Sequence, residues 1–244
     1  MNEISMKSSF LDSLPRLSKD STLFFQCDPS VPCFNRCCGD LHLTLSPYDV
    51  LRLRNYLEVD SRTFIENYAD VEVLQGNQFP SIKLRMDDHQ QQSCPFVRDT
   101  GCSVYSHRPG ACRVYPLGRG ASIDEHGKIH EEYILVKEPH CFGFASSTPI
   151  SISDYLESQG MGPYISFDDR YIQLMHRWNQ YGRPLPKSLF GKVFIAVYRP
   201  DDLHLIREDI SPSLPKNKDT RNLKCVENEL LQAFCWLEEN IFKK

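Results

Sequence analysis

The 244-residue chain has no strong excess of charge and no long apolar run. Its 28 Lys and Arg against 32 Asp and Glu give a net charge of −4, which offers no general attraction to nucleic acid or anionic lipid. No uncharged stretch approaches the roughly 20 apolar residues that span a bilayer, and residues 1–7 lack the apolar segment of a secretory signal. We therefore expect a soluble, cytoplasmic protein without a membrane or nucleic-acid partner.

The common sequence signatures of catalysis are also missing. The chain contains no G-x-G-x-x-G, P-loop, H-E-x-x-H or G-x-S-x-G motif. Its adjacent aspartates, such as Asp168-Asp169 and Asp201-Asp202, are more typical of helix caps and turns than of acid–base pairs. The catalytic residues, if there are any, are therefore unknown from the sequence.

Cysteine is what the chain has in excess, with ten residues. A reducing cytoplasm does not favour structural disulfides, and packing alone needs few free thiols. Two of the ten, Cys225 and Cys235, lie in a C-terminal segment whose apolar stripe predicts a packed helix, so we expect them to be structural. The other eight fall in proline- and glycine-interrupted segments: Cys27, Cys33, Cys37, Cys38, Cys94, Cys102, Cys112 and Cys141.

These eight clustered cysteines are expected to be metal ligands. A thiolate site takes about four soft ligands from short loops that bend around the ion. The patterns C-x5-C-x3-C-C and C-x7-C-x9-C, the second completed by Cys141, supply four each. Zinc ions or an iron–sulfur cluster both satisfy this count, and the adjacent cysteines favour the cluster slightly. Buried thiols or disulfides account for the pattern less well.

Two pairings follow from local geometry. Side chains of an extended Cys37-Cys38 pair diverge, so we expect the pair to serve two metals or two irons of one cluster. A hairpin folded about residues 125–126 places Cys112 opposite residues 139–140. Cys112 and Cys141 are therefore expected to meet in one centre at the open end of the hairpin.

Arginines interleave with the second group of cysteines. A zinc ion bound by four thiolates carries a charge of about −2, so nearby guanidinium groups stabilise it. We expect Arg108 and Arg113 to support the bound cofactor in this way; the alternative is that the arginines lie on a solvated face and that Arg108-Pro109 sets a turn. His107 and His140 are weaker candidates, expected to be polar neighbours rather than ligands.

Several of these segments resemble a known family. The resemblance is to the YkgJ-type cysteine cluster family in its longer bacterial form, and it rests on Cys27 to Cys38, Cys94-Pro95-Phe96, Gly101 to Tyr105, Arg108-Pro109, Cys112 to Leu117 and Cys141. The first cysteines are spaced more widely here than in the C-x2-C-x2-C-C form. The family's domain is described as zinc- or iron-chelating, and the resemblance extends to flagellin lysine N-methylases.

The resemblance implies a metal-binding protein that holds an iron–sulfur cluster or Zn²⁺. Three alternatives stay open: a metal-cluster-dependent protein-modifying enzyme, a purely structural zinc module, and a metal store or delivery protein. Each allows an unidentified protein partner or substrate, which the C-terminal helices would contact.

An α+β fold is expected, with a cysteine-rich domain of loops and a β-hairpin over 20–145 and a helical subdomain over 150–244. Alternating apolar residues predict strands over 41–45 and 82–86 and a hairpin over 114–136 that turns at 124–127. Ser46 and Ser61 are read as helix caps. The later part is expected to hold helices from Ser153, from a cap at 166–169, from Ser188 and over the last 20 or so residues, with a loop at Pro212 and Pro215.

Overall fold

The computed structural model describes residues 14–87, 92–207 and 222–242, and combines helices with short antiparallel sheets. The strands are β1 (Arg16–Leu17), β2 (Thr22–Phe24), β3 (Thr44–Leu45), β4 (Ala69–Val73), β5 (Pro80–Leu84), β6 (Val97–Arg98), β7 (Gly101–Cys102), β8 (Leu117–Ile123), β9 (Ile129–Leu135) and β10 (Pro149–Ser151). The α-helices are α2 (Pro47–Tyr56), α3 (Ser61–Tyr68), α4 (Gly110–Val114), α5 (Ile152–Ser158), α6 (Gly162–Asn179), α7 (Lys187–Tyr198) and α8 (Leu223–Asn240). Short 3-10 turns are η1 (Arg36–Cys38), η3 (Tyr105–His107), η4 (Gly143–Ala145) and η5 (Pro200–Leu205). This confirms the α+β class.

Strands β8 and β9 form the predicted hairpin, but β8 begins at Leu117 and not at Val114, because Val114 ends the helix α4. They pair in register from Leu117 opposite Leu135 to Ile123 opposite Ile129, and β1 pairs with the outer edge of β9. At the turn, the Asp124 carboxylate accepts the backbone N–H groups of His126 and Lys128. The hairpin is therefore centred on residue 126, as its alternating pattern and turn residues indicate.

The helix α2 begins with the capping box expected at Ser46. The Ser46 hydroxyl accepts the N–H of Asp49, and the Asp49 carboxylate accepts the N–H of Ser46. The next helix is capped one residue earlier than expected, by Asp60 rather than Ser61, because the Asp60 carboxylate accepts the N–H of Thr63.

Two predicted strands are shorter or shifted in the structure. The strand expected over 41–45 is reduced to β3, and that expected over 82–86 lies two residues earlier, in β5. Together with β4 they form a three-stranded sheet in the order β3-β5-β4.

The helices of the later part follow the sequence expectations with one exception. Helix α5 begins at the Ser151 cap, α7 close to Ser188, and α8 at the Asn222 cap. Helix α6 begins at Gly162, so the cap predicted at 166–169 is wrong and lies inside the helix. The loop expected at Pro212 and Pro215 lies outside the described residues.

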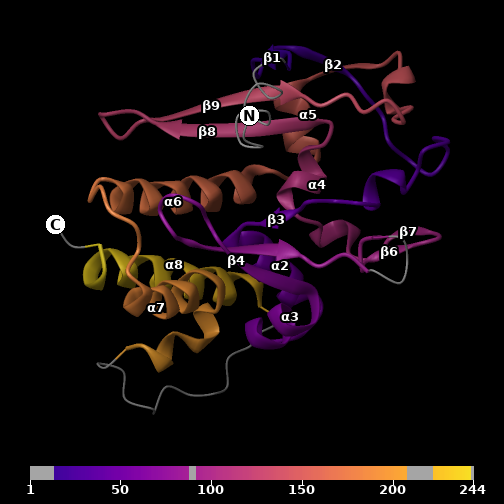
Figure 1. The fold of residues 1–244 in the computed structure, drawn as a ribbon. Coiled ribbons are helices and arrows are strands. Elements are labelled where there is room, and N and C mark those ends of the chain that lie inside the picture. Colours follow the sequence, from indigo (N-terminus) through magenta and orange to yellow (C-terminus); the bar gives the residue numbers. More distant parts are fainter. Residues whose placement is uncertain (1–13, 88–91, 208–221, 243–244) are drawn as a thin grey trace, which may run out of the picture.

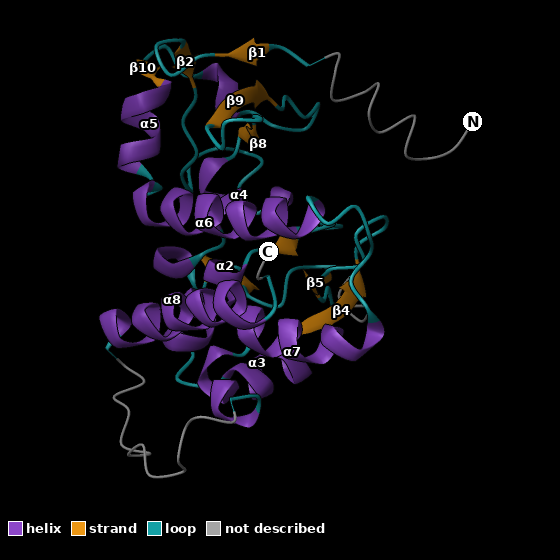
Figure 2. Cartoon of the chain, turned by 90° about the vertical axis from the view of Figure 1, so that its left-hand side faces the viewer, coloured by secondary structure: helices purple, strands orange, loops and turns teal. Residues whose placement is uncertain are grey.

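Helix α2 occupies the middle of the core and joins the two parts of the chain. It packs against α6, α7 and α8, and the buried apolar residues form one cluster. Figure 2 shows α6 between the strands β8 and β9 on one side and the helices α2, α7 and α8 on the other. The division into 20–145 and 150–244 stays a prediction. No helix in the described part of the chain is long and apolar enough to cross a bilayer.

Candidate metal centre

Seven of the eight clustered cysteines come from three loop regions at one end of the molecule, and the eighth, Cys112, comes from a short helix. The loops that hold residues 27–38, 94–102 and 137–145 lie together, away from the turn of the β8–β9 hairpin (Figure 1). Cys37 and Cys38 stand in η1, Cys102 ends β7 and Cys112 lies in α4. All ten cysteines are free thiols. Cys225 and Cys235 lie on the exposed side of α8, so the expectation that they pack as structural residues is wrong; the apolar stripe of α8 is made by other residues, such as Val226, Leu230 and Leu237.

Tight turns shape the first cysteine loop. The N–H groups of Val31, Phe34 and Arg36 bond to carbonyls three residues earlier, at 2.9–3.1 Å. Asn35 takes the left-handed conformation with φ 70°, which reverses the chain just before η1. The loop is therefore a series of turns that keeps Cys33 close to the Cys37-Cys38 pair.

Backbone hydrogen bonds join the first loop to the second. The N–H of Cys94 donates to the carbonyl of Cys38 at 2.7 Å, and the Asn35 side-chain amide donates to the carbonyl of Arg98 at 3.0 Å. A Cβ on Gly101, which has φ 121°, would lie 3.2 Å from the Phe34 ring. The close approach of the two loops at this point therefore suits glycine.

The loop over 137–145 contacts the loop over 27–38 through a hydrogen bond to a cysteine sulfur. The N–H of Phe142, which follows Cys141, donates to Sγ of Cys33 at 3.1 Å. The N–H of Gln26 donates to the carbonyl of Gly143 at 3.0 Å. These two contacts bring Cys141 beside the segment that carries Cys27 and Cys33.

Electrostatic interactions place the sulfurs in two neighbourhoods, around Cys27 and around Cys112, which share Cys37. Burial raises the pKa of Cys27 to about 11, and the thiolates of Cys37, Cys33 and Cys141 contribute to this rise. Burial likewise raises the pKa of Cys112 to about 12, and its sulfur neighbours are Cys94, Cys102 and Cys37. Mutual repulsion of this kind disappears when a cation binds between the sulfurs.

The Cys37-Cys38 pair lies at the junction of these neighbourhoods. The pair is not extended, as the sequence-based prediction assumed, but sits in the turn η1, where the two thiols are hydrogen-bonded to each other. This bond lowers the pKa of Cys37 to about 7 and raises that of Cys38. The tight turn accounts for the difference, because it places successive side chains closer than a strand does.

Backbone N–H groups point at two sulfurs of the second loop. The N–H groups of Phe96 and Val97 lie near the Cys94 sulfur and oppose the rise in its pKa that burial causes, and the Val97 N–H also donates to the Cys94 carbonyl at 3.1 Å. The N–H of Val104 does the same for Cys102. Donors of this kind stabilise a thiolate, so the local backbone already suits the charged, metal-binding form.

The arginines expected beside the cofactor have different roles in the structure. The Arg113 guanidinium is buried and bonds to three backbone carbonyls, those of Arg108, Ser106 and Gln159. Arg108 stacks on the Tyr105 ring with 3.8 Å between its Cζ atom and the ring centroid. Its positive charge lowers the pKa of both Cys37 and Cys102, after stronger effects of hydrogen bonding and burial.

Both candidate histidines are engaged with other groups. His107 stacks on Tyr56 at 4.5 Å between ring centroids, and its Nδ1 lies 2.9 Å from the Ser106 hydroxyl. Nδ1 of His140 lies 3.4 Å from the Glu138 carboxylate. These contacts agree with the expectation that the histidines are polar neighbours.

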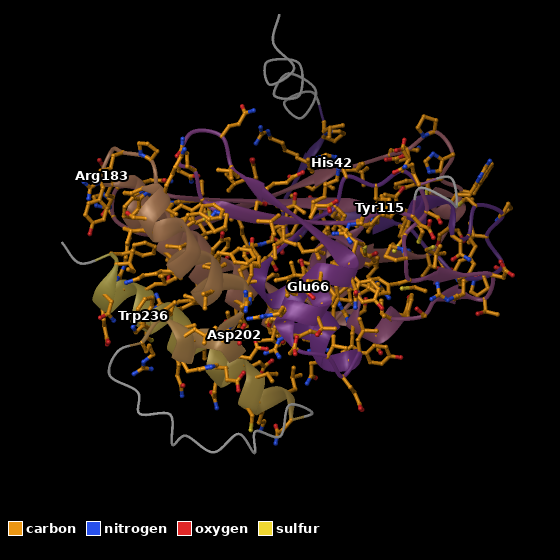
Figure 3. All side chains as sticks on the ribbon, turned by 60° about the horizontal axis from the view of Figure 1, so that its bottom comes forward. His42, Glu66, Tyr115, Arg183, Asp202 and Trp236 are labelled. Carbon is orange, nitrogen blue, oxygen red and sulfur yellow. The ribbon has the colours of Figure 1, made fainter. Side chains whose placement is uncertain are left out.

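Tyr115 is a neighbour of the cysteines that sequence reasoning missed. Burial raises the pKa of its hydroxyl, and the hydroxyl interacts with the Cys141 sulfur. In Figure 3, Tyr115 lies toward the cysteine end and Arg183 at the opposite end. No sequence signal identifies this contact, because the β8–β9 hairpin separates Tyr115 from Cys141 in the chain and only its return brings them together.

The donor set suits a soft metal. Eight sulfurs, several with N–H donors, match the ligands that zinc and iron–sulfur clusters take. Within the described residues, however, no three His, Cys, Asp or Glu side chains already converge as a metal site. The sulfurs would therefore draw together on binding. A cleft of about 550 Å³, lined in part by Arg98, Asp99 and Thr100, also reaches Cys94.

Comparison with known proteins agrees with this location. Residues 26–141 match the model of the CxxCxxCC family, described as a putative zinc- or iron-chelating domain. This segment is therefore similar to that family. The match begins one residue before Cys27 and ends at Cys141, so it contains all eight clustered cysteines and excludes Cys225 and Cys235. No curated protein and no solved structure matches the chain. This similarity supports metal binding by residues 26–141.

Proposed function

We propose that the chain is a thiolate metal-binding protein with two adjacent groups of four sulfurs. The outer group consists of Cys27, Cys33, Cys37 and Cys141. The inner group consists of Cys38, Cys94, Cys102 and Cys112. The observation that supports this division is the bond from the Phe142 N–H to the Cys33 sulfur at 3.1 Å, which brings Cys141 beside the first loop. The electrostatic neighbours agree with it: Cys27 interacts with the other outer sulfurs and Cys112 with Cys94 and Cys102, while Cys37 interacts with both.

This grouping revises one of the two pairings expected from the sequence. We assign Cys37 and Cys38 to different groups, which keeps the expectation from the sequence, although their thiols are hydrogen-bonded to each other. Cys112 and Cys141 are assigned to different groups, because Cys141 lies beside Cys27 and Cys33. The hairpin register alone could not separate them, since both cysteines lie beyond its paired residues.

Each group of four sulfurs has the ligand count of one zinc ion or one iron–sulfur cluster. Arg108 would stabilise both groups, because its charge acts on Cys37 and on Cys102. Arg113 would hold the segment that carries Arg108 and Cys112. A reducing compartment such as the cytoplasm would keep all the thiols free for metal.

Anaerobic purification followed by elemental and sulfide analysis tests the proposal. A colourless protein with about two zinc ions per chain would support two mononuclear sites. A brown protein with iron and acid-labile sulfide would support iron–sulfur clusters in the same groups. Protein without zinc or iron that also fails to bind either metal on reconstitution would overturn the proposal.

A further inference from the structure

The Asp49 carboxylate of α2 bonds to the first residue of α4, the short helix that carries Cys112. Asp49 is only 4% exposed, and its Oδ1 accepts the N–H of Gly110 at 2.7 Å. Its Oδ2 accepts the N–H of Ser46 at 2.9 Å, within the capping box of α2. One buried side chain therefore bonds to the backbone at the start of two helices.

The bond from Gly110 is additional to the capping of α2. A capping box needs the N3 carboxylate to accept only the N–H of the N-cap residue, which is Ser46 here. Helix α4 begins after Pro109, whose side chain makes no cap hydrogen bond. The Asp49 carboxylate therefore serves α4 as the side-chain cap that its own N-cap residue cannot provide.

Other contacts of the same segment also lead to the helices of the core. The Tyr164 hydroxyl of α6 donates to the carbonyl of Arg108 at 3.2 Å, and the Tyr164 ring centroid lies 4.8 Å from Cζ of Arg113. A helix of five residues has little stability of its own, so these contacts set its position. Because Cys112 follows Gly110 by two residues, its place is fixed by α2 and α6 and not by the cysteine loops alone.

We infer that Asp49 is a positioning residue for metal binding, because its bond to Gly110 holds α4, and with it Cys112, against the core. This inference rests on the proposed function, in which Cys112 is a ligand, and is independent of how the eight cysteines divide into groups. No three candidate ligands converge within the described residues, so the sulfurs must draw together on a bound ion. A ligand whose position is already fixed loses less conformational entropy in this step, which strengthens the site.

The test compares two variants of the same capping box in the full-length protein. Asp49→Ala removes both acceptor oxygens, so α4 loses its link to α2. Ser46→Ala is the matched control, because it removes the hydroxyl that accepts the Asp49 N–H and leaves the bond to Gly110 in place. The zinc affinity, measured by competition with a chromogenic chelator, should fall about 10- to 100-fold in Asp49→Ala, the range for lost groups that orient metal ligands. In Ser46→Ala the zinc affinity should equal that of the wild type.

A second readout separates positioning from a general loss of stability. In the zinc-loaded proteins, alkylation followed by peptide mapping should label Cys112 of Asp49→Ala faster than the other seven clustered cysteines. The exposed Cys225 should be labelled equally in all the proteins. Tyr164→Phe keeps the packed ring and the Asp49 charge but loses the bond to Arg108. This variant should therefore show the same selective labelling of Cys112, to a smaller extent.

Two results would overturn the inference while leaving metal binding intact. One is equal labelling of all eight clustered cysteines in Asp49→Ala, and the other is a zinc affinity equal to that of Ser46→Ala. Either result would confine the role of Asp49 to the stability of the fold. Failure of the wild-type protein to bind zinc or iron at all would instead overturn the proposed function.

Discussion

Single cysteines differ in their environments, and this difference supports the proposed distinction between metal ligands and other cysteines. Cys225 and Cys235 are exposed on α8, whereas Cys112 is a neighbour of three other clustered sulfurs. We expect Cys112→Ser to lower the metal content of the purified protein, because a serine hydroxyl is a poor substitute for a thiolate. Cys225→Ser and Cys235→Ser should leave the metal content unchanged. Elemental analysis checks this, and equal losses in all three variants would contradict the assignment.

The Arg113 guanidinium makes three hydrogen bonds that depend on its planar shape. Its three donors reach the carbonyls of Arg108, Ser106 and Gln159, which a lysine ammonium on a different stem cannot reproduce. Arg113→Lys should therefore lower the free energy of unfolding by about 2 kcal/mol, the scale of a lost buried charged hydrogen bond. The midpoint of urea unfolding measures this. Arg62→Lys is the control, because the Arg62 side chain is 57% exposed and its ion pair with Asp202 is 3.9 Å long. An equal change in both variants would contradict the role given to Arg113.

The carboxyl of Asp168 is expected to make the stability of the protein depend on pH. Burial, followed by repulsion from Asp49, raises its pKa to about 7, and its buried Oδ1 has no hydrogen-bond partner among the described residues. Because the folded pKa lies above the unfolded value, this group favours folding less as the pH rises from about 4 to about 7. Above pH of about 7, the ionised Asp168 carboxylate lowers the free energy of unfolding by a constant amount.

We therefore expect Asp168→Asn to be more stable than the wild type at pH of about 8, with the difference shrinking toward pH of about 5. Urea midpoints of the two proteins at both pH values measure this. Comparison with the wild type at each pH cancels the common effect of acid on metal binding. A difference that is the same at both pH values would show that the Asp168 carboxyl does not titrate in this range.

At the scale of elements, Gly143 controls the distance between two cysteine loops. A Cβ there would lie 2.5 Å from the Phe25 ring and 2.9 Å from the Gln26 carbonyl oxygen. Gly143→Ala should push the loop of Cys141 away from that of Cys27, cost about 1–3 kcal/mol of stability, and weaken the outer metal site. Urea unfolding and zinc titration measure the two effects.

Gly191→Ala is the matched control for Gly143→Ala. Gly191 lies in α7, and its Cβ would meet nothing within 4 Å. Alanine is the better helix former by about 1 kcal/mol, so this variant should be as stable as the wild type or more so, with unchanged zinc binding. If Gly143→Ala bound zinc as the wild type does, the close approach of the two loops would not matter for the outer group.

The elements that the sequence predicts correctly are those with local signals. The β8–β9 hairpin has both alternation and an Asp124-to-Gly127 turn, and α2 has its complete capping box. Helix α6 begins before the predicted cap because Tyr164 and Phe167 pack on the Tyr48 ring, at 4.9 and 4.4 Å between ring centroids. This tertiary packing outweighs the capping signal of Ser166.

For the candidate site, too, the sequence predicts what has a local signal and misses what depends on tertiary contacts. The eight cysteines could be selected from the sequence, because a core needs few free thiols and proline-broken loops bury little apolar surface. The proposed division into two groups could not be predicted from the sequence, because it depends on contacts such as the bond from the Phe142 N–H to the Cys33 sulfur, 109 residues apart in sequence. The sequence also gives no signal that η1 turns Cys37 and Cys38 toward each other.

At the scale of the whole molecule, metal removal should affect the loops and the core differently. The loops over 27–39 and 94–112 contain few fully buried apolar side chains, whereas α2, α6 and α8 share the large apolar core. A metal that closes such loops offsets the conformational entropy that their own packing cannot. Because α2 packs on the C-terminal helices, it should keep its structure although it lies within the cysteine-rich part of the chain.

We therefore expect chelation to accelerate amide exchange in the cysteine loops while α2, α6 and α8 stay protected. Exchange followed by mass spectrometry, with and without a zinc or iron chelator, measures this. Loss of protection in α2 together with the loops would show that the whole segment over 20–145 folds as one metal-dependent unit, as a separate domain would. Equal protection of the loops before and after complete metal removal would show that the thiols are held by packing alone.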